Sequence, residues 1–260
     1  MITSKDNEII KQAARLVKSA RFRRESGLFT AEGVRLCRDG VLSGAGVEQF
    51  LYTSDAKEKY GEDYEKISSA AKCSHEISRA LFEKISDTRS PQGFFCVFNM
   101  LDKPSFPYTI NNRGSYVALE NLQDPSNLGT ILRTAEALGI YGVILSANCC
   151  DIYSPKVVRG SMGAVFRMPS YIPGNFTAFM DKLARQGINV YGSTLHNADN
   201  ITDIDINGGV MLVGNEGNGL SEQTLAVCTR RVKIPMRGRA ESLNAAAAAG
   251  ILMWEMCREK

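Results

Sequence analysis

The sequence predicts an α/β protein with a large C-terminal domain built on a parallel sheet and a smaller N-terminal α/β domain. From residue 115 onward, apolar runs of strand length alternate with helical segments, which is typical of consecutive βα units. Polar or glycine-bearing loops follow three of these strands, and ligands of parallel sheets gather at the carboxyl ends of strands. Residues 102–113 carry two prolines and two asparagines with little periodicity, which indicates a break between the halves.

The composition is typical of a globular protein. The chain has 260 residues, of which 44% are hydrophobic and 23% charged, and its net charge of +3 says little about partners. The N-terminus is polar and no apolar run has transmembrane length, so we expect no membrane segment. Seven cysteines, with Cys149 and Cys150 adjacent, favour the reduced thiols of the cytoplasm. With only two histidines, His75 and His196, we expect no metal site.

The N-terminal domain is expected over residues 1–105, followed by a linker over 106–113. An apolar periodicity that starts at Ile10 predicts a helix over 7–24. The other predicted elements are strands over 50–52 and 93–98 and helices over 63–71 and 78–85. Their order predicts a small α/β sandwich.

A basic stretch marks this domain. Between Lys11 and Arg38, eight basic residues stand against two acidic ones. Three of them, Arg21, Arg23 and Arg24, are candidate contacts for a nucleic-acid phosphate backbone. A solvated helix face also explains these residues, because the basic side chains do not all share one side of the predicted helix.

The C-terminal domain is expected over residues 114–260. Its predicted strands span 116–119, 142–145, 164–168, 189–193, 210–213 and 232–234. Its predicted helices span 128–138, 155–162, 176–185 and 222–227, with a last helix after residue 244. Taken alone, this pattern fits a flavodoxin-like or Rossmann-like sheet.

The first ligand-type loop, residues 120–133, has the sequence ENLQDPSNLGTILR. A strand ends, a proline-containing turn follows, and a helix begins near Asn127. In one interpretation Asn127 caps the helix and Arg133 is an ordinary exposed arginine. In the other, the helix N-terminus and Arg133 together face an anion such as a phosphodiester.

The second loop, residues 210–221, has the sequence VMLVGNEGNGLS. Gly214, Gly217 and Gly219 follow an apolar strand and indicate a close approach of the backbone to another group. Their G-x-x-G-x-G spacing differs from the dinucleotide-binding G-x-G-x-x-G, which argues against a nucleotide-dependent oxidoreductase. Glu216 within this loop suits an amine or hydroxyl ligand.

The third loop lies in residues 232–255, VKIPMRGRAESLNAAAAAGILMWE. A short strand leads into a loop with proline and glycine, and then into a helix that Ser242 or Asn244 would cap. The alanines at 245–249 favour a helix but are too small to fill an ordinary core layer. They predict either a tightly packed core helix or a close approach of the helix to a ligand.

These three loops together carry a family resemblance. The segments NLQDPSNLGTILRTA (121–135), GNEGNGLS (214–221), and IPM with SLNAAAA (234–248) resemble the three motifs of the SpoU/TrmH family of the SPOUT superfamily. Members of this family are RNA 2′-O-ribose methyltransferases. The segments FTAEGVRL (29–36) and ISDTRSPQG (85–93) resemble the family's L30e/L7Ae-like RNA-binding domain.

The resemblance implies an α/β domain with a deep trefoil knot that binds S-adenosyl-L-methionine. The cofactor-binding positions that it implies are Thr194, Gly214, Ile234, Met236 and Leu243. The catalytic positions that it implies are Asn127, Arg133, Glu216, Ser242 and Asn244. One departure is Ala246, where many relatives have a small hydroxyl residue.

The implied activity is methylation of a ribose 2′-OH, with ribosomal RNA of the 23S type favoured, by a cytoplasmic homodimer. The alternatives are transfer RNA as the substrate, methylation of a base nitrogen, and a non-catalytic RNA-binding or ribosome-assembly protein. The family assigns Arg133 to activation of the hydroxyl. Because a guanidinium stays protonated, we expect Arg133 instead to clamp a phosphate and stabilise the developing alkoxide.

Overall fold

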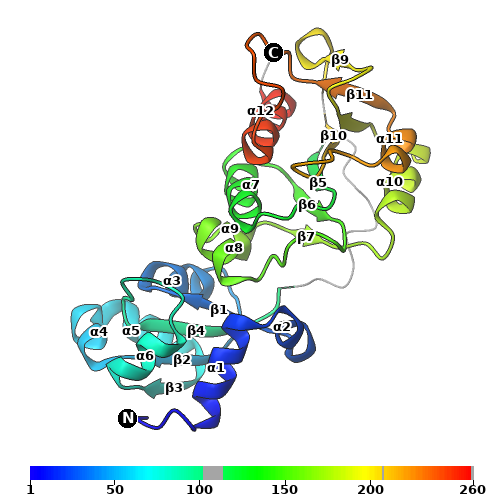
Figure 1. Cartoon of the computed structure of the whole chain (residues 1–260). Helices are drawn as coiled ribbons and strands as arrows, with labels where there is room; N and C mark the ends of the chain where they lie inside the picture. Colours follow the sequence, from blue (N-terminus) through cyan, green and yellow to red (C-terminus); the bar gives the residue numbers. More distant parts are fainter. Residues whose placement is uncertain (102–113, 207, 259–260) are drawn as a thin grey trace. The chain divides into compact units, whose positions relative to one another are not determined.

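The computed structural model describes residues 1–101, 114–206 and 208–258 (Figure 1). These residues form two compact units. Unit 1 comprises Met1–Leu101 and Asp151–Arg167, and unit 2 comprises Asp102–Cys150 and Met168–Lys260. The linker predicted over 106–113 lies outside the described residues. Residues 151–167, here called the inserted arm, belong to unit 1 although they interrupt unit 2 in sequence.

Within the described residues, the sheet of unit 1 has four strands in the order β1-β4-β2-β3. They are β1 (Leu28–Glu32), β2 (Val47–Tyr52), β3 (Ala71–Glu76) and β4 (Phe94–Asn99). β4 is antiparallel to β1 and β2, whereas β3 is parallel to β2. The strands predicted over 50–52 and 93–98 are confirmed as β2 and β4.

Two helices replace the single one predicted over residues 7–24: α1 (Glu8–Lys18) and α2 (Ala20–Ser26). Ser19 separates them, because its backbone is extended and its hydroxyl accepts a hydrogen bond from the backbone N–H of Phe22. The other described helices of unit 1 outside the inserted arm are α3 (Val34–Leu42), α4 (Ser54–Lys59), α5 (Gly61–Ala70) and α6 (Arg79–Ile85).

The side chains of β4 alternate between two cores. Phe95 and Val97 pack with Leu16 of α1 and Phe82 of α6, all of them buried. On the opposite face α3 approaches the sheet closely, since a Cβ at Gly40 would overlap the ring of Phe98. Helices therefore cover both faces, which explains why β4 is apolar and buried from Phe94 to Phe98.

The inserted arm carries α8 (Pro155–Gly160) and α9 (Ala164–Arg167). The helix predicted to open at Pro155 is confirmed, but the strand predicted over 164–168 is wrong. Met162 and Gly163, with positive φ angles of 51° and 89°, separate the two helices. An apolar run as short as the one in α9 does not by itself distinguish strand from helix.

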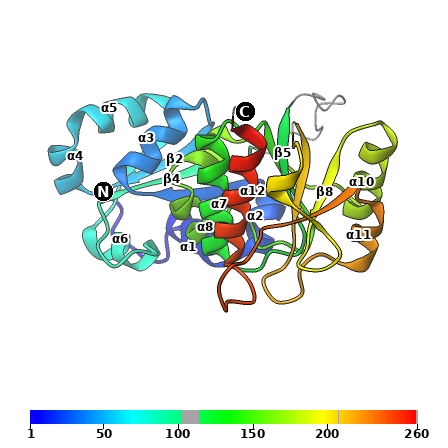
Figure 2. The ribbon, with the colours of Figure 1, turned by 90° about the horizontal axis from the view of Figure 1, so that it is seen from above.

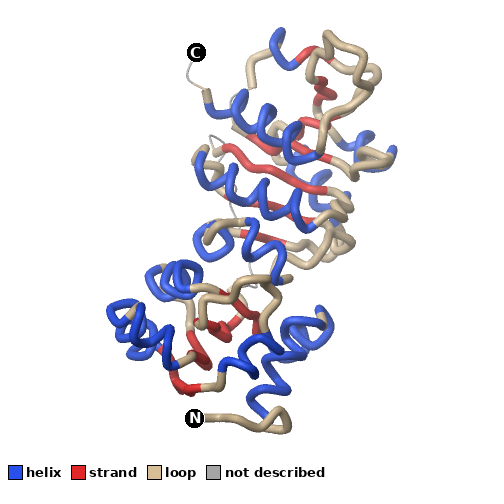
Figure 3. The backbone as a smooth tube through the Cα atoms, turned by 60° about the vertical axis from the view of Figure 1, so that its left-hand side comes forward, coloured by secondary structure: helices blue, strands red, loops and turns tan. Residues whose placement is uncertain are grey.

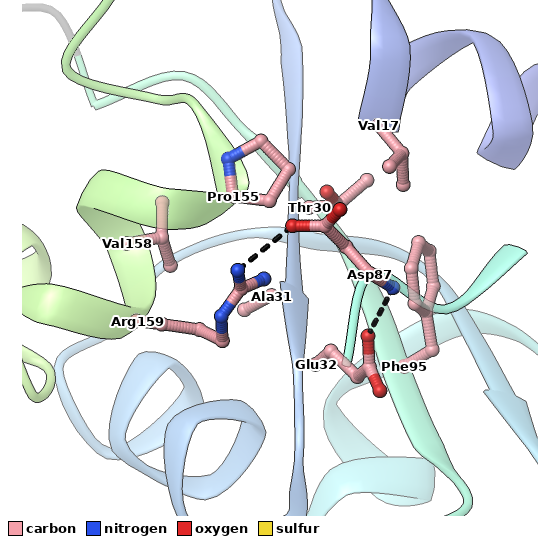
Figure 4. Close-up of a pocket in the computed structure, with 9 residues that line it drawn as sticks. All are labelled: Val17, Thr30, Ala31, Glu32, Asp87, Phe95, Pro155, Val158 and Arg159. Carbon is pink, nitrogen blue, oxygen red and sulfur yellow. Dashed lines mark hydrogen bonds and ion pairs between the residues drawn. The ribbon is translucent and has the colours of Figure 1, made fainter. Parts of the chain in front are cut away.

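Aromatic and charged contacts hold the arm within unit 1. The ring centroid of Phe29 lies 4.6 Å from that of Tyr153 and 5.8 Å from that of Phe166. Arg159 of α8 forms an ion pair of 2.8 Å with Asp87, whose backbone N–H donates to Glu32 (Figure 4). The arm thus completes the core of unit 1 on the side of β1.

Within the described residues, the sheet of unit 2 has seven strands in the order β7-β6-β5-β10-β8-β11-β9, and every pairing is parallel. The strands are β5 (Ser115–Leu119), β6 (Gly142–Leu145), β7 (Ser170–Tyr171), β8 (Val190–Ser193), β9 (Asp199–Asn200), β10 (Gly209–Val213) and β11 (Arg230–Lys233). Residues of β5 and β10 are buried throughout, because helices cover both faces (Figure 3). The predicted parallel α/β class is confirmed.

Four longer helices form the outer layers of this sheet. They are α7 (Pro125–Ala137), α10 (Phe176–Arg185), α11 (Glu222–Val227) and α12 (Ala245–Cys257), with the short 3₁₀ helix η1 (Ile201–Asp203) at the edge. Met180 and Leu183 of α10 pack with Leu225 of α11 against Ile144 and Leu212 on one face. The described part of the chain contains no helix with the length and apolar character required to cross a bilayer.

Helices α7 and α12 lie side by side (Figures 1 and 2). Ala245, Ala246 and Ala249 are buried on α12. A Cβ at Gly250 would lie 3.8 Å from the side chain of Thr134 on α7, which is an ordinary van der Waals distance. The buried alanines agree with the interpretation of the alanine run as part of a packed core helix.

Candidate active site

The site is built at the carboxyl ends of β5 and β10, which are neighbours in the sheet, and at the N-terminus of α12. α7 begins at Pro125, and Asp124 caps it by accepting from the N–H of Ser126 at 2.8 Å. The interpretation of Asn127 as the cap is therefore wrong. Asn127 lies in the first turn, where its side chain is free for other contacts and only 6% of the residue is exposed.

Asn127 joins the three predicted loops. Its Nδ2 donates to Oε1 of Glu216 at 3.0 Å, and its Oδ1 accepts from Nδ2 of Asn244 at 2.9 Å. The Oδ1 of Asn244 caps α12 by accepting from the N–H groups of Ala246 and Ala247. Three of the five predicted catalytic residues thus form one hydrogen-bonded chain, here called the amide–carboxylate chain (Glu216, Asn127 and Asn244).

Glu216 holds the second loop on the first. Its carboxylate accepts from the backbone N–H groups of Gln123 at 3.3 Å and Asp124 at 3.1 Å, as well as from Asn127. Burial raises the pKa of this carboxyl group, but the hydrogen bonds from Asn127 and these backbone groups outweigh it and leave the pKa below its ordinary value. Glu216 therefore stays ionised at neutral pH and acts as an acceptor.

The loop that carries Glu216 is closed on itself. Asn215 and Gly219 exchange two backbone hydrogen bonds of 3.0 and 2.9 Å, and Gly219 has a positive φ of 67°. A Cβ at Gly214 would overlap the backbone of Gly219 and Leu220. Close backbone approach, which the glycines predicted, is therefore a contact of the loop with itself.

A pocket of about 590 Å³ lies beside the ends of β8 and β11. Its lining residues are Leu195, His196, Asn200, Lys233, Ile234, Pro235, Met236 and Glu241. Of the predicted cofactor positions, Ile234 and Met236 line this pocket, whereas Thr194, Gly214 and Leu243 do not. The pocket residues that the motifs missed, such as His196 and Glu241, lie within a few positions of predicted ones, so proximity in sequence was the available signal.

Two predicted catalytic residues stay outside the amide–carboxylate chain. Arg133 is exposed on α7, and the described residues give its guanidinium no ion-pair partner. Ser242 is exposed in the loop before α12. Both side chains are therefore free to contact a ligand.

The three predicted RNA-binding arginines differ in their surroundings. Arg21 is exposed and pairs with Glu25 at 2.6 Å, and Arg24 is exposed. Arg23 is only 3% exposed and forms an ion pair of 2.6 Å with Asp151 of the inserted arm. Because it also donates to the carbonyl groups of Leu16 and Val17, the prediction that Arg23 contacts RNA phosphates is wrong.

The described residues contain no cluster of three or more histidine, cysteine, aspartate or glutamate side chains placed to hold a metal ion. The polar side chains of the amide–carboxylate chain bond to one another or to backbone groups.

Comparisons with known proteins bear on both parts of the chain. Residues 114–254, more than half of the chain, match the model of the SpoU rRNA Methylase family, and residues 7–96 match the MRM3-like substrate binding domain. An uncharacterized tRNA/rRNA methyltransferase of Synechocystis is 31% identical over 260 residues, which cover 100% of this chain and 94% of that protein. The 23S rRNA (guanosine(2553)-2′-O)-methyltransferase RlmP of Bacillus subtilis is 28% identical and covers 98% of each chain.

Solved structures agree with these matches. The AdoMet-bound rRNA methyltransferase of Sinorhizobium meliloti has a TM-score of 0.83 and 29% identity, with 98% of this chain and 95% of that chain covered. The SpoU methyltransferase AviRb of Streptomyces viridochromogenes, in complex with AdoMet, has a TM-score of 0.86 and 28% identity, with 96% of each chain covered. The chain, with its three motif loops joined at one edge of a parallel sheet, belongs to the SpoU rRNA methylase family.

Proposed function

We propose that this protein transfers the methyl group of S-adenosyl-L-methionine to a ribose 2′-hydroxyl group of ribosomal RNA. The observation that carries the proposal is the amide–carboxylate chain, which brings the three motif loops of a SpoU family member together. Relatives named as 23S rRNA 2′-O-methyltransferases support ribosomal RNA as the substrate class. Transfer RNA is the second candidate, because the Synechocystis relative is named for both RNAs.

The pocket beside β8 and β11 suits the cofactor. Its apolar side chains, Ile234, Pro235 and Met236, would cover the adenosine, and Lys233, Asn200 and Glu241 would meet its polar groups. Neighbouring structures with bound AdoMet support this assignment. When bound, the cofactor supplies an activated methyl group on a sulfonium, so the protein mainly has to orient the attacking ribose and handle one proton.

The chain's own residues divide this work. Asn127 and Asn244 bond to each other and to Glu216, so we assign them to positioning the loops. The exposed Arg133 is assigned to a phosphate of the RNA and to the developing alkoxide, because a guanidinium donates well but does not act as a base. The exposed Ser242 is assigned to the ribose or cofactor by hydrogen bonding.

Unit 1 is assigned to RNA binding, with Arg21 and Arg24 as phosphate contacts. The match of residues 7–96 to a substrate binding domain supports this role. All seven cysteines are free thiols, which suits the cytoplasm, where ribosomal RNA is found. The proposal includes an RNA-binding domain over residues 1–105 and a catalytic domain over residues 114–260 that contains a trefoil knot.

We further propose a homodimer that covers the outer face of α12. Glu255 is the one charged residue of this helix and is buried, whereas the apolar side chains of Ile251 and Trp254 remain 43% and 58% exposed on it. Large apolar side chains that are exposed next to one another on a helix mark a surface that another protein covers. A second copy of the chain would bury these two side chains.

The decisive experiment measures methyl transfer from labelled S-adenosyl-L-methionine to unmodified ribosomal and transfer RNA transcripts. Digestion to nucleosides and mass spectrometry would identify the product, with Arg133→Ala run beside the wild type. We expect a 2′-O-methylnucleoside from ribosomal RNA and a loss of about tenfold or more in the variant. A methylated base or methylation of transfer RNA alone would contradict the proposal in its reaction or its substrate, respectively.

A further inference from the structure

Glu120 is a buried carboxylate to which neither the motifs nor the proposed mechanism assigns a role. It directly follows β5, and only 6% of its surface is exposed. Its Oε2 accepts from the backbone N–H of Ser221 at 2.8 Å. Its Oε1 accepts from the hydroxyls of Ser221 at 2.8 Å and Thr224 at 2.7 Å. Among the described residues no cation pairs with it, so these neutral donors alone compensate its buried charge.

These contacts cross from the loop after β5 to the end of the loop after β10. Glu216 makes the reverse connection, because it extends from the loop after β10 to the N–H groups of Gln123 and Asp124 in the loop after β5. Each loop therefore sends one carboxylate to backbone donors of the other. We call this arrangement the reciprocal brace, formed by Glu120 and Glu216.

The brace fixes both ends of the second loop. At its start, Nδ2 of Asn215 donates to the carbonyl of Asn121 at 2.8 Å, and at its end Ser221 is held by Glu120. Glu216 lies between these two anchors. Its carboxylate can meet Asn127 only while the loop keeps this position, so Glu120 acts on Asn127 through Glu216.

Capping of α11 does not account for Glu120. The hydroxyl of Ser221 already caps this helix by accepting from the N–H of Thr224 at 3.2 Å. A buried carboxylate is costly, and a helix that already has a cap gains little from a second one. The hydrogen bonds of Glu120 instead hold the loop after β10 against the loop after β5.

We propose that Glu120 is a positioning residue for methyl transfer, which holds the loop carrying Glu216 against the loop carrying Asn127. The inference rests on the proposed function for its effect on the rate, but the hydrogen bonds of the brace can be tested apart from activity. Glu120 does not touch the reacting groups. Its loss should therefore lower kcat while leaving RNA affinity within about twofold, because RNA is held mainly by unit 1.

The test is a double-mutant cycle of Glu120→Gln and Glu216→Gln. Each variant should lower kcat about tenfold or more, because a hydrogen-bonded charge is lost. Together they should lower it little further, because each carboxylate is needed for the same arrangement. Glu255→Gln serves as the matched control: Glu255 is also buried, but it pairs with Arg258 on α12, so its effect should add independently to that of Glu216→Gln.

A second measurement does not depend on activity. In Glu120→Gln without cofactor, the amide of Asp124, which bonds to Glu216 and not to Glu120, should exchange hydrogen about tenfold faster. The amide of Leu212 inside β10 should exchange at the wild-type rate. Thr224→Val, which removes one donor and keeps the side-chain shape, should produce the same change on a smaller scale and covers the case in which Glu120→Gln does not fold.

Unchanged exchange at Asp124 in both variants, or additive losses in the cycle, would overturn the brace. A wild-type protein that transfers no methyl group would contradict the proposed function instead, and the exchange measurement would still decide about the brace.

Discussion

Arg23 and Arg24 are adjacent residues of the same type in opposite surroundings. Arg23 is buried and holds Asp151 through an ion pair, while Arg24 is exposed. Sequence alone predicts the same role for both arginines, because Asp151 lies 128 positions further along the chain and no local pattern connects it to Arg23. A buried partner so far away is visible only once the chain has folded.

We therefore expect the two arginines to contribute differently to the free energy of unfolding. Arg23→Ala should lower the free energy of unfolding by about 3 kcal/mol or more, because it leaves a partly buried carboxylate and two carbonyl groups without their donor. Arg24→Ala should change it by less than about 0.5 kcal/mol. Urea denaturation of both variants checks this, and equal stabilities would contradict the assignment.

For RNA affinity we expect the opposite order, in which the exposed Arg24 matters more than the buried Arg23. Arg24→Ala should weaken binding of a ribosomal RNA fragment and lower the slope of log affinity against log salt by about one contact. Filter binding at several salt concentrations measures both quantities. If Arg24→Ala left affinity and slope at wild-type values, Arg24 would have no place in the RNA-binding surface.

Glu216 gives a prediction about pH. Its pKa is lowered in the folded protein, so the ionised form stabilises the fold. This contribution is complete above the ordinary carboxyl pKa of about 4.3 and is lost as the pH falls through the lowered value. The difference in unfolding free energy between wild type and Glu216→Gln should be constant at neutral pH and shrink in acid. Denaturation curves over a pH series test it, with exposed Glu222→Gln as the control.

At the scale of secondary-structure elements, the loop after β10 offers a matched pair of glycines. A side chain at Gly214 would overlap backbone atoms, which cannot move aside easily, whereas a Cβ at Gly217 would meet only the Oδ1 of Asn215 at 3.5 Å. Gly214→Ala should therefore displace Glu216 and reduce methyl transfer about tenfold or more, while Gly217→Ala should keep most activity. Equal activities of the two variants would show that the loop tolerates the displacement.

Elements with strong periodicity or a clear cap were predictable. The helices Phe176–Arg185 and Glu222–Val227 lie at their predicted bounds, and Asn244 caps α12. Elements with weak patterns were missed: β3 is a largely polar edge strand, and α9 was read as a strand because four residues carry no period. Local sequence thus identified the motif loops but not their hydrogen-bond partners.

At the scale of the whole molecule, the order of strands could not be derived from periodicity. The alternation of strands and helices predicts a parallel sheet, but the order β7-β6-β5-β10-β8-β11-β9 depends on pairings between distant segments. The trefoil knot was implied only by the family resemblance and stays a prediction, since a pattern of neighbours does not record how a chain is threaded.

The proposed dimer belongs to the same scale. Trp254→Glu should convert it to a monomer, because a charge would replace the more exposed of the two large apolar side chains on the outer face of α12. Ile172→Glu, which alters a side chain with a similar exposure of 52% outside this helix, is the control. Sedimentation velocity measures the mass of each variant. A wild-type monomer, or a dimer that survives Trp254→Glu, would rule out this interface.

The inserted arm has a consequence for how the protein is made. The ribosome synthesises a chain in the direction from N-terminus to C-terminus, and domains generally fold as they emerge. Unit 1 starts first but lacks Tyr153 and Phe166 until the arm has been synthesised, which happens after β5, α7 and β6 of unit 2. During that interval, the aromatic partners of Phe29 and the ion-pair partner of Arg23 have not yet been synthesised. Unit 1 is therefore completed only by a segment that is translated after the first three elements of unit 2.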